Sequence, residues 1–184
     1  MAVPAGNLRQ AVAAIRAGGI VAYATEAVFG LGCDPRNRRA VDRLRRIKQR
    51  SLRKGFILIA AHPGQLAPYV WAIPPRALAT WPGPHTWLVP ARSGIAYSWI
   101  TGRSRSIAVR VTAHRQAAAL CRACRMAIVS TSANRAGQRP ARSEREVRRR
   151  FGSLVDYVLP GRVGGARRPT PIRDAVSGRL VRPG

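Results

Sequence analysis

The sequence predicts an α/β protein with a twisted sheet of mixed parallel and antiparallel strands, flanked by helices. Segments with apolar residues at helical spacing alternate along the chain with short apolar runs of strand length. The chain ends in a pattern typical of a hairpin. Its 184 residues, 46% of them hydrophobic, are enough to bury one core, and no linker, repeat or low-complexity tract divides them. We therefore expect residues 1–184 to form a single domain.

The N-terminal segment predicts a helix followed by a buried strand. Apolar residues recur at helical spacing from residue 8 to residue 15, with Asn7 as the expected N-cap and the glycines at 18–19 as the stop. Residues 20–23 form a continuous apolar run, which favours a buried strand. A loop over residues 24–27 then leads into a segment whose two glycines allow close backbone approach.

A second helix and a second strand enclose a basic loop. Asn37 is the expected N-cap of a helix with apolar residues at positions 41, 44 and 47. Residues 56–60 form an apolar run of strand length, so the basic segment 47–55 connects the helix to a strand. Connections of this kind commonly carry functional residues in α/β proteins.

The middle of the chain predicts a short helix and two strands. The helix follows Pro74-Pro75, and a Pro-Gly-Pro turn leads into a strand over residues 86–89. Residues 93–105 are expected to form a loop. In the strand over residues 106–111, alternation with apolar neighbours directs Arg110 to the opposite face.

The C-terminal part continues the same alternation. Its expected elements are a helix over 115–125, strands over 126–130 and 156–159, and a hairpin of 172–176 with 179–182. Ser143 and Glu146 form a capping box for a further long helix. The run Ser130-Thr131-Ser132-Ala133-Asn134 follows a predicted strand, at the end where open α/β sheets bind ligands. The alternative is a polar turn that satisfies its own backbone.

The charge of the chain is extreme, and its lysines are clustered. The 33 basic and 7 acidic residues give a net charge of +26, which attracts polyanions such as ATP and RNA. The arginines are scattered over nearly every predicted helix, so part of this charge is solvated surface. The two lysines, Lys48 and Lys54, both lie in the 47–55 segment. Because a compact ammonium and a planar guanidinium are not interchangeable around a phosphate, the clustering predicts an anion site, with chance as the alternative.

Several kinds of catalytic site are disfavoured. The histidines, His62, His85 and His114, stand in unrelated contexts and no G-x-S-x-G motif is present, which disfavours a hydrolase triad. The carboxylates do not pair with histidines at ligand spacing, so no protein-held metal is predicted. In the absence of a Walker loop and a G-x-G-x-x-G motif, phosphates would be held mainly by basic side chains.

The cysteines and the hydropathy pattern indicate a reduced, soluble protein. Cys121 and Cys124 form a C-x-x-C, but a zinc site needs four ligands and no second pair exists, so both are expected as reduced helix residues. The N-terminus lacks the apolar core of a signal peptide, and no uncharged stretch approaches the roughly 20 residues of a membrane span. We expect a cytoplasmic protein without membrane association.

Five short motifs follow one another along the chain. They are Tyr23-Ala24-Thr25-Glu26-Ala27-Val28-Phe29-Gly30-Leu31-Gly32, Lys48-Gln49-Arg50 with Lys54-Gly55, Trp81-Pro82-Gly83-Pro84-His85-Thr86, Ser106-Ile107-Ala108-Val109-Arg110-Val111, and Ser130-Thr131-Ser132-Ala133-Asn134. In this order they resemble the YrdC-like family, and within it the single-domain TsaC-type threonylcarbamoyl-AMP synthases. The resemblance extends from the first expected helix to the terminal Arg-Pro-Gly.

The resemblance implies a nucleotidyltransferase with a basic concave face. Such an enzyme condenses L-threonine, bicarbonate or CO2, and ATP accompanied by Mg2+ into L-threonylcarbamoyladenylate and pyrophosphate. A threonylcarbamoyl-transfer complex would then modify an adenosine beside the anticodon of tRNA. The implied partners are therefore ATP, threonine, bicarbonate, tRNA and that complex.

The resemblance also assigns roles to individual residues. The implied ATP-binding residues are Lys48, Arg50, Lys54, Ser106, Ser132, Asn134 and Arg182. The first three of these are the implied catalytic residues. The implied threonine-binding residues are Ala27, Arg110, Ser130 and Thr170, with Thr25 as a substitute for the hydroxyl that position 27 lacks.

Two positions depart from the family pattern, and two other functions are alternatives. Family members commonly have Pro and Thr where this chain has Ala24 and Ala27, so a rigid ring and a hydroxyl are missing. One alternative is a basic RNA-binding protein without catalysis, although aromatic residues are only 6% and no RNA-recognition pattern is evident. The other is a YrdC-like enzyme that forms carbamoyl adenylate, an activity found in long multidomain chains.

Overall fold

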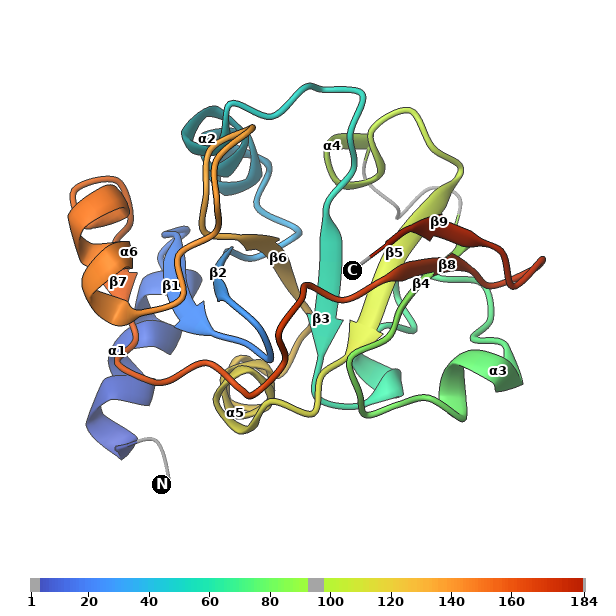
Figure 1. The fold of residues 1–184 in the computed structure, drawn as a ribbon, viewed down its shortest axis with the longest axis horizontal. Helices are drawn as coiled ribbons and strands as arrows, with labels where there is room; N and C mark the ends of the chain where they lie inside the picture. Colours follow the sequence, from blue (N-terminus) through green and yellow to red (C-terminus); the bar gives the residue numbers. More distant parts are fainter. Residues whose placement is uncertain (1–3, 93–97, 184) are drawn as a thin grey trace.

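The computed structural model describes residues 4–92 and 98–183, and these residues adopt the predicted α/β fold (Figure 1). The helices are α1 (Ala5–Arg16), α2 (Arg38–Lys48), α3 (Pro75–Leu78), α4 (Ser98–Thr101), α5 (Arg115–Cys124) and α6 (Glu144–Phe151), with a 3-10 turn at Pro63–Gln65. The strands are β1 (Val21–Ala24), β2 (Phe29–Gly32), β3 (Ile57–Ala60), β4 (Thr86–Pro90), β5 (Ser106–Val111), β6 (Ile128–Ser132), β7 (Tyr157–Val158), β8 (Ile172–Asp174) and β9 (Leu180–Arg182).

The strands form one mixed sheet, which confirms the prediction. Within the described residues its order is β7-β1-β2-β6-β3-β5-β4-β8-β9. The pairs β1–β7, β3–β5 and β4–β8 are parallel, and the other neighbours are antiparallel. The pairing of β8 with β9 confirms the C-terminal hairpin, although both strands are shorter than predicted.

The two faces of the sheet pack against different helices. On β1, Val21 and Tyr23 belong to a core shared with α1 and α5, whereas Ala22 and Ala24 belong to the core shared with α2 and α6. This division follows from the period of two along a strand, which sends successive side chains to opposite faces. Cys121 and Cys124 lie on α5 in the first of these cores, where burial raises the pKa of the Cys124 thiol to about 11.

Two expected helix caps are present and one is wrong. The Asn37 side chain accepts a hydrogen bond from the Ala40 amide at 3.1 Å, and the Ser143 hydroxyl accepts one from the Glu146 amide at 3.2 Å. The Glu146 carboxylate accepts from the amide of Arg142 at 2.7 Å, one residue before the Ser143 N-cap whose amide a standard capping box would use. Asn7 does not cap α1, because the helix begins at Ala5, directly after Pro4.

Three other predicted boundaries are corrected. The segment expected as a loop over residues 93–105 contains helix α4, while its first five residues lie outside the described part of the chain. The strand expected over residues 126–130 lies at Ile128–Ser132, so the first three residues of the Ser-Thr-Ser-Ala-Asn run belong to β6. The strand expected over 156–159 is reduced to β7.

Candidate functional site

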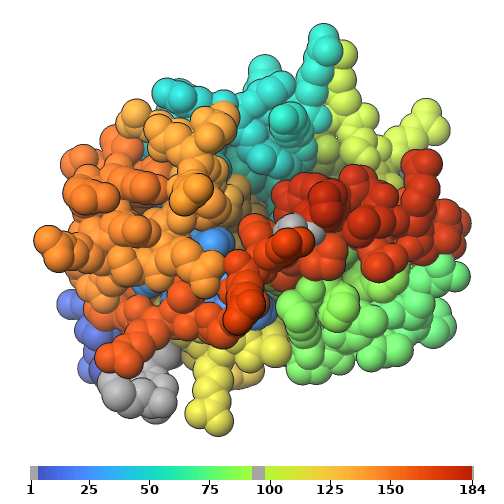
Figure 2. Space-filling view, in the orientation of Figure 1, coloured from blue at the N-terminus to red at the C-terminus, as the bar shows by residue number. Residues whose placement is uncertain are grey.

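All twelve residues implied as ligand contacts line one cavity of about 590 Å³. Figure 2 shows the surface hollowed where the segments around residues 50, 135 and 175 meet, with blue atoms from the N-terminal part of the chain visible at its base. Its cationic lining residues are Lys48, Arg50, Lys54, Arg110 and Arg182. Glu26 is the carboxylate among the lining residues.

The floor of the cavity is formed by one face of the sheet. Further along the same strands, this face packs against α1 and α5. Ile59 of β3 and Ile128 of β6 lie in that core, and two residues away on the same strands Ile57 and Ser130 line the cavity. Arg110 is paired with Ile59 in the parallel β3–β5 ladder, and it also lines the cavity. The same strands therefore supply a core at one end and a polar floor at the other.

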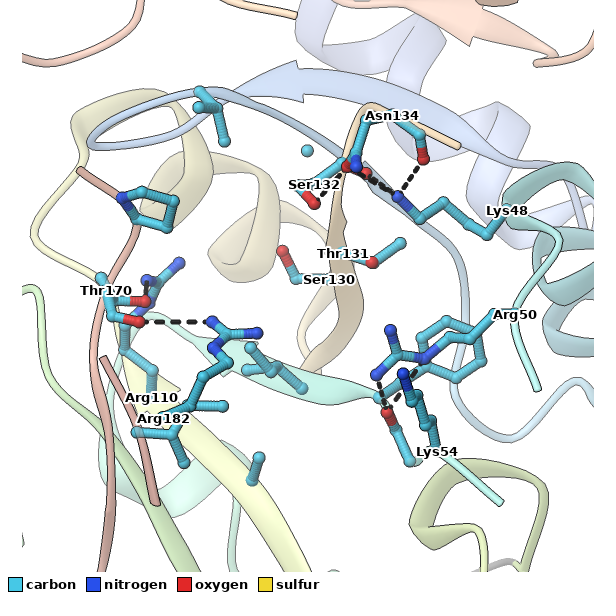
Figure 3. Close-up of a pocket in the computed structure, with 18 of the residues that line it drawn as sticks. Lys48, Arg50, Lys54, Arg110, Ser130, Thr131, Ser132, Asn134, Thr170 and Arg182 are labelled. Atoms are coloured by element: carbon cyan, nitrogen blue, oxygen red, sulfur yellow. Dashed lines mark hydrogen bonds between the residues drawn. The ribbon is translucent and has the colours of Figure 1, made fainter. Parts of the chain in front are cut away.

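At one end of the cavity, Lys48 is held by oxygen atoms (Figure 3). Its ammonium donates to the carbonyl oxygens of Ser132 and Asn134, and to Oδ1 of Asn134 at 2.9 Å. The Ser132 hydroxyl donates to the same Oδ1 at 2.5 Å. All three ammonium donors are thus engaged, and Lys48 links the C-terminus of α2 to the turn after β6. A bound phosphate would therefore interact with Lys48 mainly through its positive charge. It could accept a hydrogen bond from the ammonium only by replacing one of these three oxygens.

The surroundings of Lys48 change its titration. The side chain is buried, and desolvation together with the positive charge of Arg50 lowers the pKa of Lys48 to about 8. Burial also lowers the pKa of Arg50, with smaller contributions from Arg45 and Arg182. The three oxygen contacts stabilise the ammonium, but positive charges this close repel one another and so favour an anion that neutralises them.

The basic loop between α2 and β3 contributes Arg50 and Lys54. Nε of Arg50 donates to the carbonyl oxygen of Gly55 at 3.2 Å, and its guanidinium lies 5.1 Å from the centroid of the Phe56 ring. Lys54 is exposed and pairs with Gly102 in an isolated β-bridge. Both side chains lie on the side of the cavity that Lys48 occupies (Figure 3).

At the other end of the cavity, Arg110 is fixed by a threonine and a glutamate. Its Nη1 donates to Thr170 Oγ1 at 2.7 Å, and its Nη2 lies 3.4 Å from Glu26 Oε2. Arg182 lies beside this group and donates to the Thr170 carbonyl oxygen at 3.3 Å (Figure 3). Arg182 was implied as an ATP contact, yet it lies next to the residues implied for threonine. Ser130 is drawn between the two ends.

Glu26 is a site residue that the sequence pattern does not indicate. It is buried, and its Oε1 accepts from the Thr112 hydroxyl at 2.6 Å. Burial alone would raise the pKa of Glu26, but Arg110 and the Thr112 hydroxyl overcome this and lower it, so the side chain stays a carboxylate. A single glutamate in a loop shows no spacing pattern that would mark it as a site residue. Its partner Arg110 lies 84 positions away in sequence, and only the fold brings the two together.

The two departures at positions 24 and 27 have different consequences. The Ala24 amide donates to Gln116 Oε1 at 2.8 Å, a bond that a proline could not make. Ala27 lines the cavity with a methyl group, and the neighbouring Thr25 hydroxyl donates to the Val28 carbonyl oxygen at 2.6 Å. Thr25 therefore reaches a ligand only as an acceptor while this bond is intact.

Residues 4–92 and 98–183 contain no group of three or more His, Cys, Asp or Glu side chains that could hold a metal ion. In the same residues, every helix is too short or too polar to cross a membrane.

Comparisons with known proteins agree with one another. The threonylcarbamoyl-AMP synthase of Halorhodospira halophila is 55% identical over 180 residues, which cover 96% of this chain and 94% of that protein. The threonylcarbamoyl-AMP synthase of Coxiella burnetii is 49% identical over 180 residues, covering 96% of both chains.

Solved structures share the fold. The crystal structure of P. abyssi Sua5 complexed with L-threonine matches with a TM-score of 0.89 and 31% identity, over 96% of this chain and 54% of that one. The chain therefore spans about half the length of that protein. The structure of E. coli YciO matches with a TM-score of 0.83 and 25% identity, over 96% and 88%.

The family model for the Sua5/YciO/YrdC domain, whose description is "Telomere recombination", matches residues 13–184. That match covers nearly all of the chain, and it agrees with the curated relatives and the solved structures. The chain therefore belongs to the Sua5/YciO/YrdC family.

Proposed function

We propose that this protein is an L-threonylcarbamoyladenylate synthase. It condenses L-threonine, bicarbonate or CO2, and ATP into threonylcarbamoyl-AMP and pyrophosphate. The observation that carries the proposal is one cavity that joins an anchored lysine cluster at one end to a buried arginine clamp at the other. The names of the curated relatives favour this reaction over carbamoyl-adenylate formation and over RNA binding without catalysis.

The geometry suits an in-line displacement. The threonine amine adds to CO2 and loses a proton to give a carbamate, one oxygen of which attacks the α-phosphorus of ATP as pyrophosphate leaves. This step needs positioning and neutralisation of charge more than a protein nucleophile. Lys48, Arg50 and Lys54 would neutralise the triphosphate, while Ser132 and Asn134 hold Lys48 in place. Ser106, which lines the same cavity, would also contact the nucleotide.

The threonine subsite would lie at the Arg110 end. Arg110 would hold the carboxylate of threonine with parallel hydrogen bonds, since a guanidinium matches a carboxylate in this way. Thr170 and Ser130 would supply hydroxyl groups around the ligand, and Ala27 and Thr25 would complete the wall. Arg182, which lies beside Thr170 at the Arg110 end, would contact the nucleotide from the threonine side.

The wider role follows from the same proposal. The chain would act as one YrdC-like domain over residues 1–184, with a basic concave face around the cavity. Its product would pass to a threonylcarbamoyl-transfer complex that modifies tRNA in the cytoplasm. Mg2+ would enter with ATP, bound to the phosphates.

Mass spectrometry of the reaction products tests the proposal. The purified protein is incubated with ATP, Mg2+ and bicarbonate, and with each amino acid in turn. We expect a threonylcarbamoyl-adenylate peak that requires both threonine and bicarbonate. The absence of any adenylate with threonine, combined with tight RNA binding, would replace this proposal with the non-catalytic alternative.

A further inference from the structure

The basic loop over residues 49–55 is held by a buried arginine that lies outside the cavity. Arg45 projects from the last turn of α2, is 5% exposed and is not among the cavity-lining residues. Backbone bonds inside the loop are short turn bonds, such as Lys54 N to Ser51 O at 3.1 Å, and its backbone also pairs with residues 102–103 through the Lys54–Gly102 bridge. The orientation of Arg50 and Lys54 therefore depends on contacts that the loop makes with its surroundings.

Arg45 donates to carbonyl groups of two separate segments. Its Nη1 donates to the carbonyl oxygens of Ser51 at 2.7 Å and Lys54 at 3.0 Å, both within the loop. Its Nη2 donates to the carbonyl oxygen of Trp99 in α4 at 2.7 Å. One guanidinium thus fixes both ends of the 51–54 turn and ties it to α4. A planar fork is suited to this because its donors diverge toward separate acceptors.

Arg45 also shares an aromatic ring with a residue of the cavity. The guanidinium carbons of Arg45 and Arg50 lie 4.8 and 5.1 Å from the centroid of the Phe56 ring. Contacts of this length are typical of cation–π interactions. The ring therefore places Arg50 relative to Arg45, while the Arg50 guanidinium donates to the Gly55 carbonyl oxygen.

The loop is seated tightly on α4. A Cβ atom at Gly55 would lie 2.7 Å from the Thr101 carbonyl oxygen and 2.8 Å from that of Ile100. The Phe56 amide donates to the Ile100 carbonyl oxygen at 2.7 Å. Arg45 acts on the same contact between loop and helix, from the side away from the cavity.

We propose that Arg45 is a positioning residue for the ATP subsite, which acts through its planar guanidinium on the loop that carries Arg50 and Lys54. The inference rests on the proposed function for the identity of the ligand. Burial of a cation is costly, and desolvation lowers the pKa of Arg45. A purely structural arginine would change stability when replaced, whereas a positioning residue changes the affinity for one of the two substrates.

Arg45→Met tests the assignment, with Arg46→Met as the matched control. Arg46 is the exposed next residue of the same helix. Initial rates are measured with ATP and threonine varied separately, at a temperature where thermal melts show that both variants are folded. We expect Arg45→Met to raise the KM for ATP at least about tenfold and to leave the KM for threonine unchanged. Arg46→Met should leave both unchanged.

Arg45→Lys separates charge from shape. It keeps the positive charge but cannot span the carbonyl groups of Ser51, Lys54 and Trp99, so the KM for ATP should stay raised by about threefold or more. An unchanged KM for ATP in Arg45→Met would overturn the assignment, and so would an equal rise in both KM values. Wild-type kinetics in Arg45→Lys would overturn the role of the planar fork.

A double-variant cycle and a binding assay complete the test. If Arg45 acts through the loop, Arg45→Met should raise the KM for ATP less than about twofold in a Lys54→Met, Arg50→Met background. If Arg45→Met raised the KM for ATP by the same factor in both backgrounds, the inference would be wrong. If the wild type forms no adenylate, the proposed function is wrong. Isothermal titration calorimetry with ATP then still tests Arg45, because it measures the effect of Arg45→Met on nucleotide affinity without catalysis.

Discussion

At the scale of single residues, the site depends on side chains whose hydrogen-bonding groups are already engaged by the protein. Lys48 donates to three oxygens, and Arg110 is fixed by Thr170 and Glu26. Such side chains keep their geometry before a ligand arrives, which reduces the reorganisation needed for reaction. Conservative changes at these positions are therefore expected to be harmful.

Lys48→Arg should lower turnover at least about tenfold, or roughly 1.4 kcal/mol, although it preserves charge. Three oxygens converge on the ammonium of Lys48, and a planar guanidinium cannot donate to all three from the same point. The measurement is kcat for adenylate formation, with Arg39→Lys on the exposed face of α2 as control. Unchanged turnover in Lys48→Arg would show that only its charge is needed.

Lys48 should titrate at about pH 8 in the ligand-free protein, since burial and Arg50 lower its pKa. Below that pH it is an ammonium, and above it the neutral amine dominates, so kcat/KM for ATP should fall as the pH rises through about 8. Bound ATP stabilises the ammonium and should raise the pKa. NMR of protein labelled at lysine Cε measures both values, because the chain has two lysines to assign. A titration near the ordinary value of about 10.4 would contradict the account.

Glu26→Gln should raise the KM for threonine at least about threefold and leave the KM for ATP unchanged. The change removes the charge that faces Arg110 in a buried pair, so we also expect the free energy of unfolding to fall by about 2 kcal/mol. Kinetics and urea unfolding give the two values. Glu144→Gln, in an exposed pair with Arg148, is the control and should change stability by less than about 0.5 kcal/mol. An equal loss in both variants would contradict a special role for Glu26.

At the scale of elements, strands with clear alternation were predicted best. The strand predicted over residues 106–111 is β5, and Arg110 lies on the opposite face from Ile107, Val109 and Val111, as predicted. Helix α4 was missed because four residues show no periodicity, and its place depends on bonds from Arg45 and Phe56. Every implied site residue lines the cavity. Glu26 lines it too, but it could not be predicted, because its partner Arg110 is distant in sequence.

The Gln116 side chain continues the sheet edge where β7 ends. β7 pairs with β1 as far as Ala22, and beyond that point the Ala24 amide donates to Gln116 Oε1. Nε2 of Gln116 donates to the Pro160 carbonyl oxygen at 2.7 Å. Helix α5 thus fixes the strand end that leads into the cavity wall.

Ala24→Pro should therefore lower the free energy of unfolding by about 1–3 kcal/mol, even though family members commonly carry proline there. The change removes the donor and leaves Gln116 Oε1 buried without its partner. In a Gln116→Leu background the same change should cost less, and urea unfolding of the four proteins measures the coupling. An equal cost in both backgrounds would show that the hydrogen bond is not the reason.

At the scale of the whole molecule, charge governs encounters with polyanions. The net charge is +26, and exposed arginines lie on α1, α2 and α6 as well as near the cavity. Because positive charge is spread over several faces, the electrostatic field attracts RNA without favouring one surface of the protein. Binding of the proposed tRNA partner should thus be largely electrostatic.

The affinity for tRNA should fall by about a thousandfold or more between about 50 and about 200 mM salt, because phosphate contacts release counterions. Threonine should not change this affinity, since its proposed subsite is buried in the cavity. Fluorescence anisotropy at several salt concentrations makes the measurement, with heparin as a competitor without bases. A salt-independent affinity that rises with threonine would instead indicate specific recognition coupled to the site.

The restriction of lysine to the cavity has a practical and a cellular consequence. Lys48 and Lys54 both line the cavity, so the side-chain amines of the whole chain lie at the site of the proposed reaction. Any reagent that consumes such amines, from an activated ester to a reactive acyl metabolite, becomes an active-site titrant. Coupling the protein to a surface through its side-chain amines should abolish activity, and ATP present during coupling should protect it.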